Sequence, residues 1–253
     1  GMIQNGHTSN QDIYVQNTTP EKLTQFTGET GTQACSSNKE LAAKVDVLVL
    51  AAKPNVFPSI LADIKEEIAA HQPVVVSIAA GTTLQKLSDL LNEGHQTPII
   101  RAMPNLNSQV GEGMTALCGN DYTTPEQLAF VLNMFQAIGE TIALPEKDFS
   151  TFTAIAGSSP AFVFLFIDSL ARAAVKNGMS KDVATKIAAQ AVLGSGKLVL
   201  DSKETPWNLI DQVSSPGGTT VEGILTLEDT GFISAITKAT QAVITKDQDM
   251  MQQ

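Results

Sequence analysis

Residues 213–220 combine residue types that could bind a small anion. The run reads Val-Ser-Ser-Pro-Gly-Gly-Thr-Thr, and Glu222 follows it closely. Pro216 fixes one φ angle and removes an amide donor, whereas the two glycines allow a sharp turn that approaches a ligand closely. Thr219 and Glu222 have the spacing of a capping box, which predicts the start of a helix. Free amides, hydroxyl groups and a helix N-terminus would bind a carboxylate, although an ordinary helix cap uses the same residues.

Three further segments place small or polar residues directly after predicted strands. They read Leu-Ala-Ala-Lys-Pro at 50–54, Ser-Ile-Ala-Ala-Gly at 77–81 and Arg-Ala-Met-Pro-Asn at 101–105. The carboxyl ends of parallel strands share one edge of a sheet, and α/β proteins bind ligands there. Each segment alone could be an ordinary strand exit or tight turn. Three on one edge favour a cofactor site.

Residues 1–146 are predicted to form the α/β domain that carries this edge. The expected strands are 12–16, 45–51, 73–78 and 98–102, followed by 114–118 and 140–144. The expected helices are 20–26, 38–43, 56–70, 83–91 and 125–137. Alternation of this kind predicts a parallel sheet with right-handed crossovers. Thr19-Pro20 and Thr124-Pro125 each place a cap residue before a proline at the first helical position.

Residues 147–253 are predicted to be almost wholly helical. Phe162 to Ile167 are apolar on all sides of a helix, so we expect this segment to be buried all round. Small and apolar residues also follow helical spacing from 187 to 198. A helical module with such a core often buries part of it against a partner chain. We therefore expect a homodimer, with a monomeric bundle as the alternative.

Composition bounds the class of protein. Of 253 residues, 43% are hydrophobic and 17% are charged, which indicates a globular chain. The net charge of −10 argues against a general nucleic-acid surface. Cys35 and Cys118 have neither metal-ligand nor disulfide-framework spacing, so we expect no metal and a reducing cytoplasm. The longest apolar run, 161–167, is too short to span a bilayer, and we expect no membrane partner.

The glycine fingerprint of dinucleotide-binding proteins has one formal match in the chain. Residues 111–116 read Gly-Glu-Gly-Met-Thr-Ala, but a strand-like stretch follows them in place of a helix. The context that the fingerprint needs is therefore missing, and we do not interpret this run as a cofactor loop.

The 213–220 run closely resembles the signature of the pyrroline-5-carboxylate reductase family, and the other segments follow in the family's order over essentially the whole chain. Members reduce a cyclic imino acid to proline with a nicotinamide cofactor. The resemblance implies a Rossmann-like domain followed by an all-α dimerisation domain, in which two chains interlock and form the substrate pocket. It also implies that the first strand and glycine-rich loop are missing before residue 1. A shortened protein and a natural variant are both compatible with that.

The resemblance also implies roles for individual residues. Thr220 would be catalytic, its hydroxyl bonding the ring nitrogen of 1-pyrroline-5-carboxylate. The implied substrate-binding residues are Ser215, Gly217, Gly218, Thr219 and Thr220. The implied cofactor-binding residues are Asn17, Thr18, Asn38, Ala51, Ala52, Lys53, Pro54, Ala79, Ala80, Gly81 and Asn105. Asn105 would bond the nicotinamide carboxamide, and Asn38 could equally be a helix cap.

The cofactor is expected to be NADP, with NAD as the alternative. Residues 16–19 at the end of the second strand offer no Asp or Glu for the two ribose hydroxyls of NAD. Uncharged groups there, with Lys22 nearby, favour NADP.

Two alternatives to the reductase remain open from the sequence. The missing glycine loop is compatible with a catalytically silent, oligomerising relative, because lost amide donors weaken pyrophosphate binding. Residues 156–161, Ala-Gly-Ser-Ser-Pro-Ala, resemble the family's S-G-S-G-P-A, and their departures at Ala156 and Ser159 leave open a related imine or ketone reductase.

Overall fold

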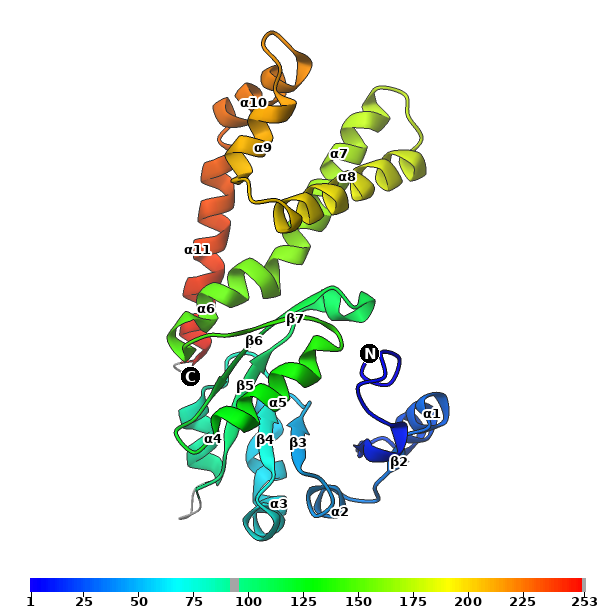
Figure 1. The fold of residues 1–253 in the computed structure, drawn as a ribbon, viewed down its shortest axis with the longest axis vertical. Coiled ribbons are helices and arrows are strands. Elements are labelled where there is room, and N and C mark those ends of the chain that lie inside the picture. The colour runs from blue at the N-terminus through cyan, green and yellow to red at the C-terminus, as the bar shows by residue number, and fades with distance from the viewer. Residues whose placement is uncertain (92–95, 252–253) are drawn as a thin grey trace. The chain divides into compact units, whose positions relative to one another are not determined.

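The computed structural model describes residues 1–91 and 96–251 (Figure 1). The chain forms two compact units. The first contains residues 1–157 and the C-terminal residues from 244 onward, and the second contains residues 158–243. The chain therefore leaves the first unit once and returns to it within its last helix.

The first unit is built on a mixed sheet whose strands lie in the order β3-β4-β5-β6-β7. These strands are β3 (Val47–Leu50), β4 (Val74–Ser77), β5 (Ile99–Met103), β6 (Gly113–Gly119) and β7 (Gly139–Ala143). A separate pair of short parallel strands comprises β1 (Tyr14–Val15) and β2 (Gln33–Ala34). Within the described residues, β1 is the first strand.

Helices connect most of these strands. They are α1 (Pro20–Thr30), α2 (Asn38–Ala42), α3 (Phe57–His71), α4 (Leu84–Leu91) and α5 (Pro125–Gln136). Short 3-10 helices cover Asn10–Asp12, Pro54–Val56, Leu106–Val110 and Glu146–Asp148. The alternation of strand and helix confirms the predicted α/β domain.

The sheet is not parallel throughout, which corrects the prediction from alternation. Strand β6 runs antiparallel to β5, with Arg101 opposite Cys118, whereas the other neighbouring strands are parallel. The connection from β5 to β6 contains only the 3-10 helix Leu106–Val110. A parallel neighbour needs a longer crossover, usually a helix, so this short connection reverses the strand direction.

Both faces of the sheet are covered by apolar side chains. On one face, Ile99 of β5 belongs to a core that includes Leu61 of α3 and Leu87 of α4. On the other face, Ile100 belongs to a core with Val131 of α5. All four residues of β4 are buried, as expected for a strand covered on both sides.

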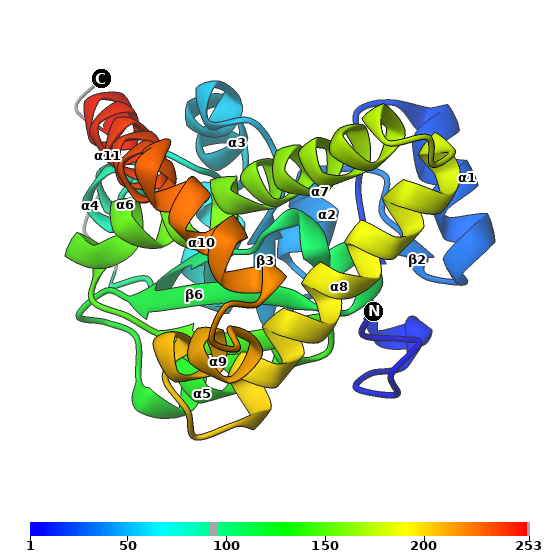
Figure 2. The ribbon, with the colours of Figure 1, turned by 90° about the horizontal axis from the view of Figure 1, so that it is seen from above.

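The second unit is helical, as predicted. It contains α7 (Ser159–Lys176), α8 (Lys181–Asp201), α9 (Pro206–Val213), α10 (Thr219–Asp229) and most of α11 (Phe232–Met251) (Figure 2). Consecutive helices α7 and α8 pack against each other. Before α7 come α6 (Phe149–Phe152), in the first unit, and a π-helical turn, Thr153–Ser158, whose last residue begins the second unit.

The apolar segment 162–167 is not buried all round by its own chain, which corrects that prediction. Phe164 and Leu165 expose 52% and 67% of their surface. Phe166 packs against Phe232 with ring centroids 6.2 Å apart, so only part of the helix surface is covered. By length and composition alone, the helical stretches Glu146–Lys176 and Lys181–Asp201 could cross a membrane, a test that core helices of soluble proteins also pass.

Candidate functional site

Residues 215–218 form a tight turn immediately before α10. The Gly218 amide donates to the Ser215 carbonyl oxygen at 2.9 Å, and Gly217 has a φ of 67°. Proline at the second position and a positive φ at the third are the features of a type II turn. A Cβ atom on Gly218 would clash with Ser215 Oγ and lie 3.0 Å from the Ser215 carbonyl oxygen. The positive φ therefore favours glycine at position 217, and the close approach to Ser215 favours it at position 218.

The capping box predicted from Thr219 and Glu222 is absent, which is a correction. The N-cap residue is Gly218, and no side chain caps the helix. Thr219 is the first helical residue, because the turn carries the chain into the helix one residue earlier than the spacing suggests. The amides of the first helical turn are thus not used by a side-chain cap, and such amides attract anions.

The predicted substrate residues gather around this turn. Thr219 and Thr220 are exposed at the start of α10, and Ser215 and Gly217 are exposed just before it. Of the amides expected to bind a carboxylate, the one of Gly218 is already used inside the turn. Among the amides expected to bind a carboxylate, this leaves those of Gly217 and Thr219.

A cavity of about 310 Å³ in the first unit collects five of the predicted cofactor residues. They are Asn17, Thr18, Asn38, Ala51 and Ala52, which come from the ends of β1 and β3 and the start of α2. Apolar side chains, among them Leu41 and Ile64, form the rest of its wall. Across the described chain, no charged residue lines this cavity.

Local hydrogen bonds fix the polar side of the cavity. The Asn17 Oδ1 atom accepts from the Thr19 amide at 2.9 Å, which holds the entry to α1. Ser37 caps α2 by accepting from the Glu40 amide at 3.1 Å. Asn38 is the first helical residue and not the cap, so the alternative role considered for it is wrong.

The other predicted cofactor residues lie outside the cavity lining. Lys53 and Pro54 are exposed at the start of a 3-10 helix after β3. The loop after β4 contains Ala79, Ala80 and Gly81; Ala79 is buried, and its amide donates to Ser77 Oγ at 3.3 Å. Because Leu50 pairs with Ser77 in parallel strands, these two segments leave the sheet at the same edge.

Asn105 uses both ends of its side-chain amide within the protein. Its Nδ2 atom donates to the Ala156 carbonyl oxygen at 3.0 Å. Its Oδ1 atom accepts from the Met114 amide at 3.2 Å. The expected bond to a nicotinamide carboxamide would therefore use the second Nδ2 hydrogen or the second Oδ1 lone pair.

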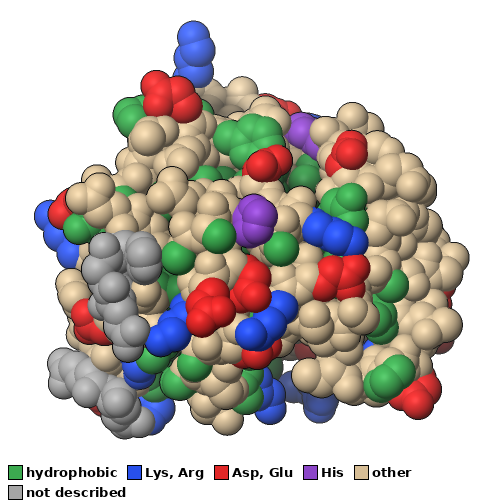
Figure 3. Space-filling model, turned by 90° about the horizontal axis from the view of Figure 1, so that it is seen from below, with side chains coloured by type: hydrophobic (Ala, Val, Ile, Leu, Met, Phe, Trp, Pro, Cys, Tyr) green, Lys and Arg blue, Asp and Glu red, His purple; other side chains and the backbone are tan. Residues whose placement is uncertain are grey.

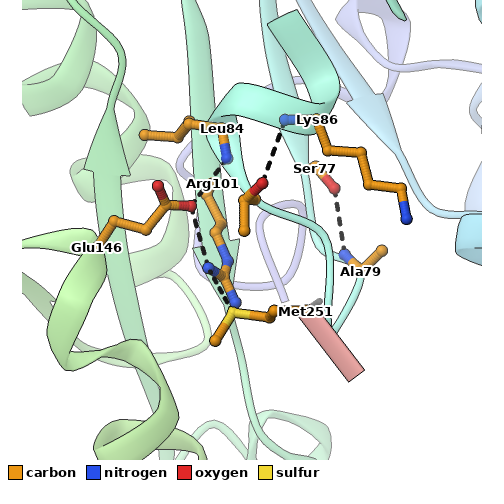
Figure 4. A network of polar contacts seen from close by, with 8 residues as sticks. Ser77, Ala79, Leu84, Lys86, Arg101, Glu146 and Met251 are labelled. Atoms are coloured by element: carbon orange, nitrogen blue, oxygen red, sulfur yellow. Dashed lines mark hydrogen bonds and ion pairs between the residues drawn. The ribbon is translucent and has the colours of Figure 1, made fainter. Parts of the chain in front are cut away.

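Arg101 has a structural setting that the sequence did not reveal (Figure 4). Its side chain is buried, and Nη1 donates to Glu146 Oε1 at 3.0 Å, while the guanidinium lies 4.6 Å from the centroid of the Phe149 ring. The Leu84 amide donates to the same Glu146 oxygen at 2.8 Å, and Met251 Sδ lies 3.7 Å from Arg101 Nη1. The sequence signal that could have revealed this setting is the position of Arg101, a charged residue within an apolar strand.

Cys118 lies opposite Arg101 on the neighbouring strand. Burial raises the pKa of its thiol to about 12, with a further increase from the negative charge of Glu146 and a partial decrease from Arg101. The thiol is therefore neutral at physiological pH, and a neutral thiol is a poor nucleophile. We assign it no chemical role.

Two other classes of site find no support in the described residues. No group of three or more His, Cys, Asp and Glu side chains in that part of the chain could hold a metal ion. The run 111–116 leads from a 3-10 helix into β6, so no helix follows it, as predicted.

One face of the molecule shows acidic and basic side chains interspersed (Figure 3).

Comparisons with known proteins converge on one family. The family model described as pyrroline-5-carboxylate reductase dimerisation matches residues 146–250, and the one described as NADP oxidoreductase coenzyme F420-dependent matches residues 1–81. The pyrroline-5-carboxylate reductase of Escherichia coli is 40% identical over 99% of this chain and 92% of its own. The Methanosarcina acetivorans reductase is 35% identical over 95% and 90%.

Solved structures agree. The pyrroline-5-carboxylate reductase from Coxiella burnetii has a TM-score of 0.92 at 30% identity, over 98% of this chain and 92% of its own. The Plasmodium falciparum pyrroline carboxylate reductase with NADP bound has a TM-score of 0.84 at 30% identity, over 99% and 91%.

Proposed function

Because this chain belongs to the pyrroline-5-carboxylate reductase family, we propose that it reduces 1-pyrroline-5-carboxylate to L-proline with NADPH, as an enzyme of proline biosynthesis. The observation that carries the proposal is the Ser215–Gly218 turn, which opens onto the uncapped N-terminus of α10. Identity of 40% over 99% of the chain favours the reductase over a silent relative or a different imine or ketone reductase.

The substrate carboxylate is bound by the turn and the helix start. The amides of Gly217 and Thr219 and the hydroxyl of Ser215 donate to it, and the positive end of the α10 dipole favours its charge. Gly218 contributes by allowing the close turn. A short, rigid turn holds these donors in one orientation, and such positioning lowers the entropic cost of reaching the transition state.

Thr220 acts on the ring nitrogen of the substrate. It is exposed one residue into α10, next to the proposed carboxylate donors. Its hydroxyl oxygen accepts a hydrogen bond from the N–H of the protonated imine. This bond stabilises the positive charge on the nitrogen next to the carbon that is reduced. That carbon gains the hydride, the C=N double bond becomes single, and the nitrogen keeps its proton as a secondary amine.

NADPH supplies the hydride when it is bound, and the first unit offers groups that fit it. The uncharged amides and hydroxyl of Asn17, Thr18 and Asn38 suit an adenosine ribose and its 2′-phosphate, because no carboxylate in the described lining repels that phosphate. Ala51, Ala52, Lys53, Pro54, Ala79, Ala80 and Gly81 bind the rest of the cofactor along the strand edge. NADP in the Plasmodium relative supports NADPH over NAD, which remains the second cofactor to test.

The assembly is a homodimer formed through the helical part of the chain, from residue 147 onward. Leu165, Ile187 and Leu198 each expose more than half of their surface on helices that the dimerisation family model covers. A second copy would remove this apolar surface from water. The exposed faces also leave room for a larger homo-oligomer.

The enzyme works in the cytoplasm. Cys35 and Cys118 are both free and buried, which suits a compartment where disulfides do not form.

The test is NADPH oxidation with 1-pyrroline-5-carboxylate by the purified chain and by a Thr220→Val variant. Loss of the hydroxyl should lower kcat about 100-fold. Thr226→Val is the matched control, because Thr226 lies on the same helix and its hydroxyl donates only to the Glu222 carbonyl at 2.8 Å. Equal activity of the two variants would remove Thr220 from the mechanism, and an inactive parent chain would refute the reductase.

A further inference from the structure

The π-helical turn Thr153–Ser158 has a local cause in the sequence. Pro160 has no amide hydrogen, and in an α-helix that hydrogen would be donated to the carbonyl of Ala156, four residues earlier. A proline ring also crowds that carbonyl. The helix widens into a π turn at this point and becomes α-helical again from Ser159. Insertions of this kind recur at functional sites.

The Ala156 carbonyl, which cannot accept a hydrogen bond from Pro160, accepts one from a side chain. Ala156 is 9% exposed, so an unpaired carbonyl there would be costly. The Asn105 Nδ2 atom donates to this oxygen at 3.0 Å. Its Oδ1 atom is held by the Met114 amide at 3.2 Å, which fixes the orientation of the side chain. Asn105 thus replaces the missing amide of Pro160.

We propose that Asn105 is a positioning residue that holds the π-helical turn in place by donating to the Ala156 carbonyl. The importance of this role for catalysis rests on the proposed reductase function. Asn105 follows β5, and Met103 of the same strand lies 3.4 Å from the position that a Cβ atom on Gly157 would take. The strand exit therefore holds the turn through the Asn105 hydrogen bond, and Met103 packs against the core cluster that contains Ala156.

Asn105→Asp separates this role from simple packing. The carboxylate has the same shape and can still accept from the Met114 amide, but it cannot donate to Ala156 and places a negative charge against its carbonyl. Asn133→Asp is the matched control, because it makes the same change on an exposed position of α5.

Hydrogen exchange of the apoprotein is the first readout, and it does not depend on activity. In Asn105→Asp we expect the amides of residues 153–159 and of Ala161 to exchange about tenfold faster, as the loss of one buried hydrogen bond implies. The remainder of the chain and all of Asn133→Asp should match the parent. Unchanged exchange in this segment would overturn the proposal. Because no substrate is involved, this result stands even if the reductase function fails.

Kinetics and rescue provide the second readout. We expect kcat to fall about tenfold in Asn105→Asp while the Kd for NADPH, from fluorescence titration, stays within about twofold. Adding Pro160→Ala restores a backbone donor for Ala156 and should recover both the exchange protection and part of kcat. A weakened Kd for NADPH without rescue would instead identify Asn105 as a direct cofactor contact and overturn the positioning role.

Discussion

At the scale of single residues, the buried guanidinium of Arg101 joins four parts of the first unit. It binds Glu146, lies over Phe149 and approaches Met251, while the Leu84 amide meets the same carboxylate. Its Nε and Nη2 atoms are buried without a hydrogen-bond partner in the described residues. Burying a charge is costly unless it is paired, so the Glu146 contact stabilises an otherwise unfavourable side chain.

Arg101→Met should therefore lower the free energy of unfolding by about 2 to 3 kcal/mol, because Glu146 loses its partner beside the core. Arg101→Lys should recover part of this loss through its charge, although it lacks the planar fork. Urea denaturation measures both. Arg172→Met is the control, since Arg172 pairs with Asp168 on the surface and its loss should matter much less. Equal losses for Arg101 and Arg172 would contradict this account.

Cys118 predicts a pH dependence of stability. The pKa of its thiol is about 12 in the folded chain, whereas a Cys thiol exposed to water has a pKa of 9.0. Above pH 9 the unfolded chain therefore releases a proton that the folded chain keeps. The contribution of Cys118 to stability must therefore fall as the pH rises from about 9 towards 12. We expect the urea midpoint to drop less between pH 8 and 10 in Cys118→Ala than in the parent. Identical drops would exclude a contribution from Cys118.

Residue types near the site were visible in the sequence, but their hydrogen-bond partners were not. The Ser-Pro-Gly-Gly run correctly indicated a tight turn before a helix, because Pro and Gly restrict the backbone locally. Thr219 and Glu222 had capping spacing, yet the turn placed Gly218 at the cap. Asn105 could not be recognised as a partner of Ala156, because that contact spans 51 positions along the chain.

At the scale of elements, two Thr-Pro pairs show how far local sequence determines a helix start. Both Pro20 and Pro125 begin helices, as predicted. Thr124 forms a full capping box with Gln127, whereas the Thr19 side chain makes no cap hydrogen bond. The antiparallel β6 was likewise missed, because strand direction depends on the length and nature of a connection more than on either strand.

Thr124→Ala should lower the free energy of unfolding by about 1 kcal/mol, the usual effect of losing a side-chain N-cap. Thr19→Ala makes the same change before the same residue type in the same unit, where there is no cap bond to lose, and should leave stability nearly unchanged. Chemical denaturation of both variants gives the comparison. A loss at Thr19 as large as that at Thr124 would show that the Thr124 cap hydrogen bond does not account for the stability of α5.

At the scale of the whole molecule, the helical part of the chain leaves large apolar side chains exposed, among them Leu165, Ile187 and Leu193. The sequence predicted that segment 162–167 would be buried, and the single chain covers only part of it. An apolar sequence pattern indicates that a surface is buried, but it does not indicate whether the same chain or a partner chain buries it. The proposed homodimer accounts for that remainder.

Leu165→Glu tests this assembly directly. Leu165 is 67% exposed on α7, and a carboxylate there would have to lose its water in an interface, which costs several kcal/mol. Light scattering should give about twice the chain mass of 26.8 kDa for the parent and a single chain mass for the variant at micromolar concentration. Phe130→Glu, at a 60% exposed position on α5 of the first unit, should remain dimeric. A parent that is monomeric, or a Leu165→Glu variant that keeps the parent mass, would place the apolar helices outside any interface between copies.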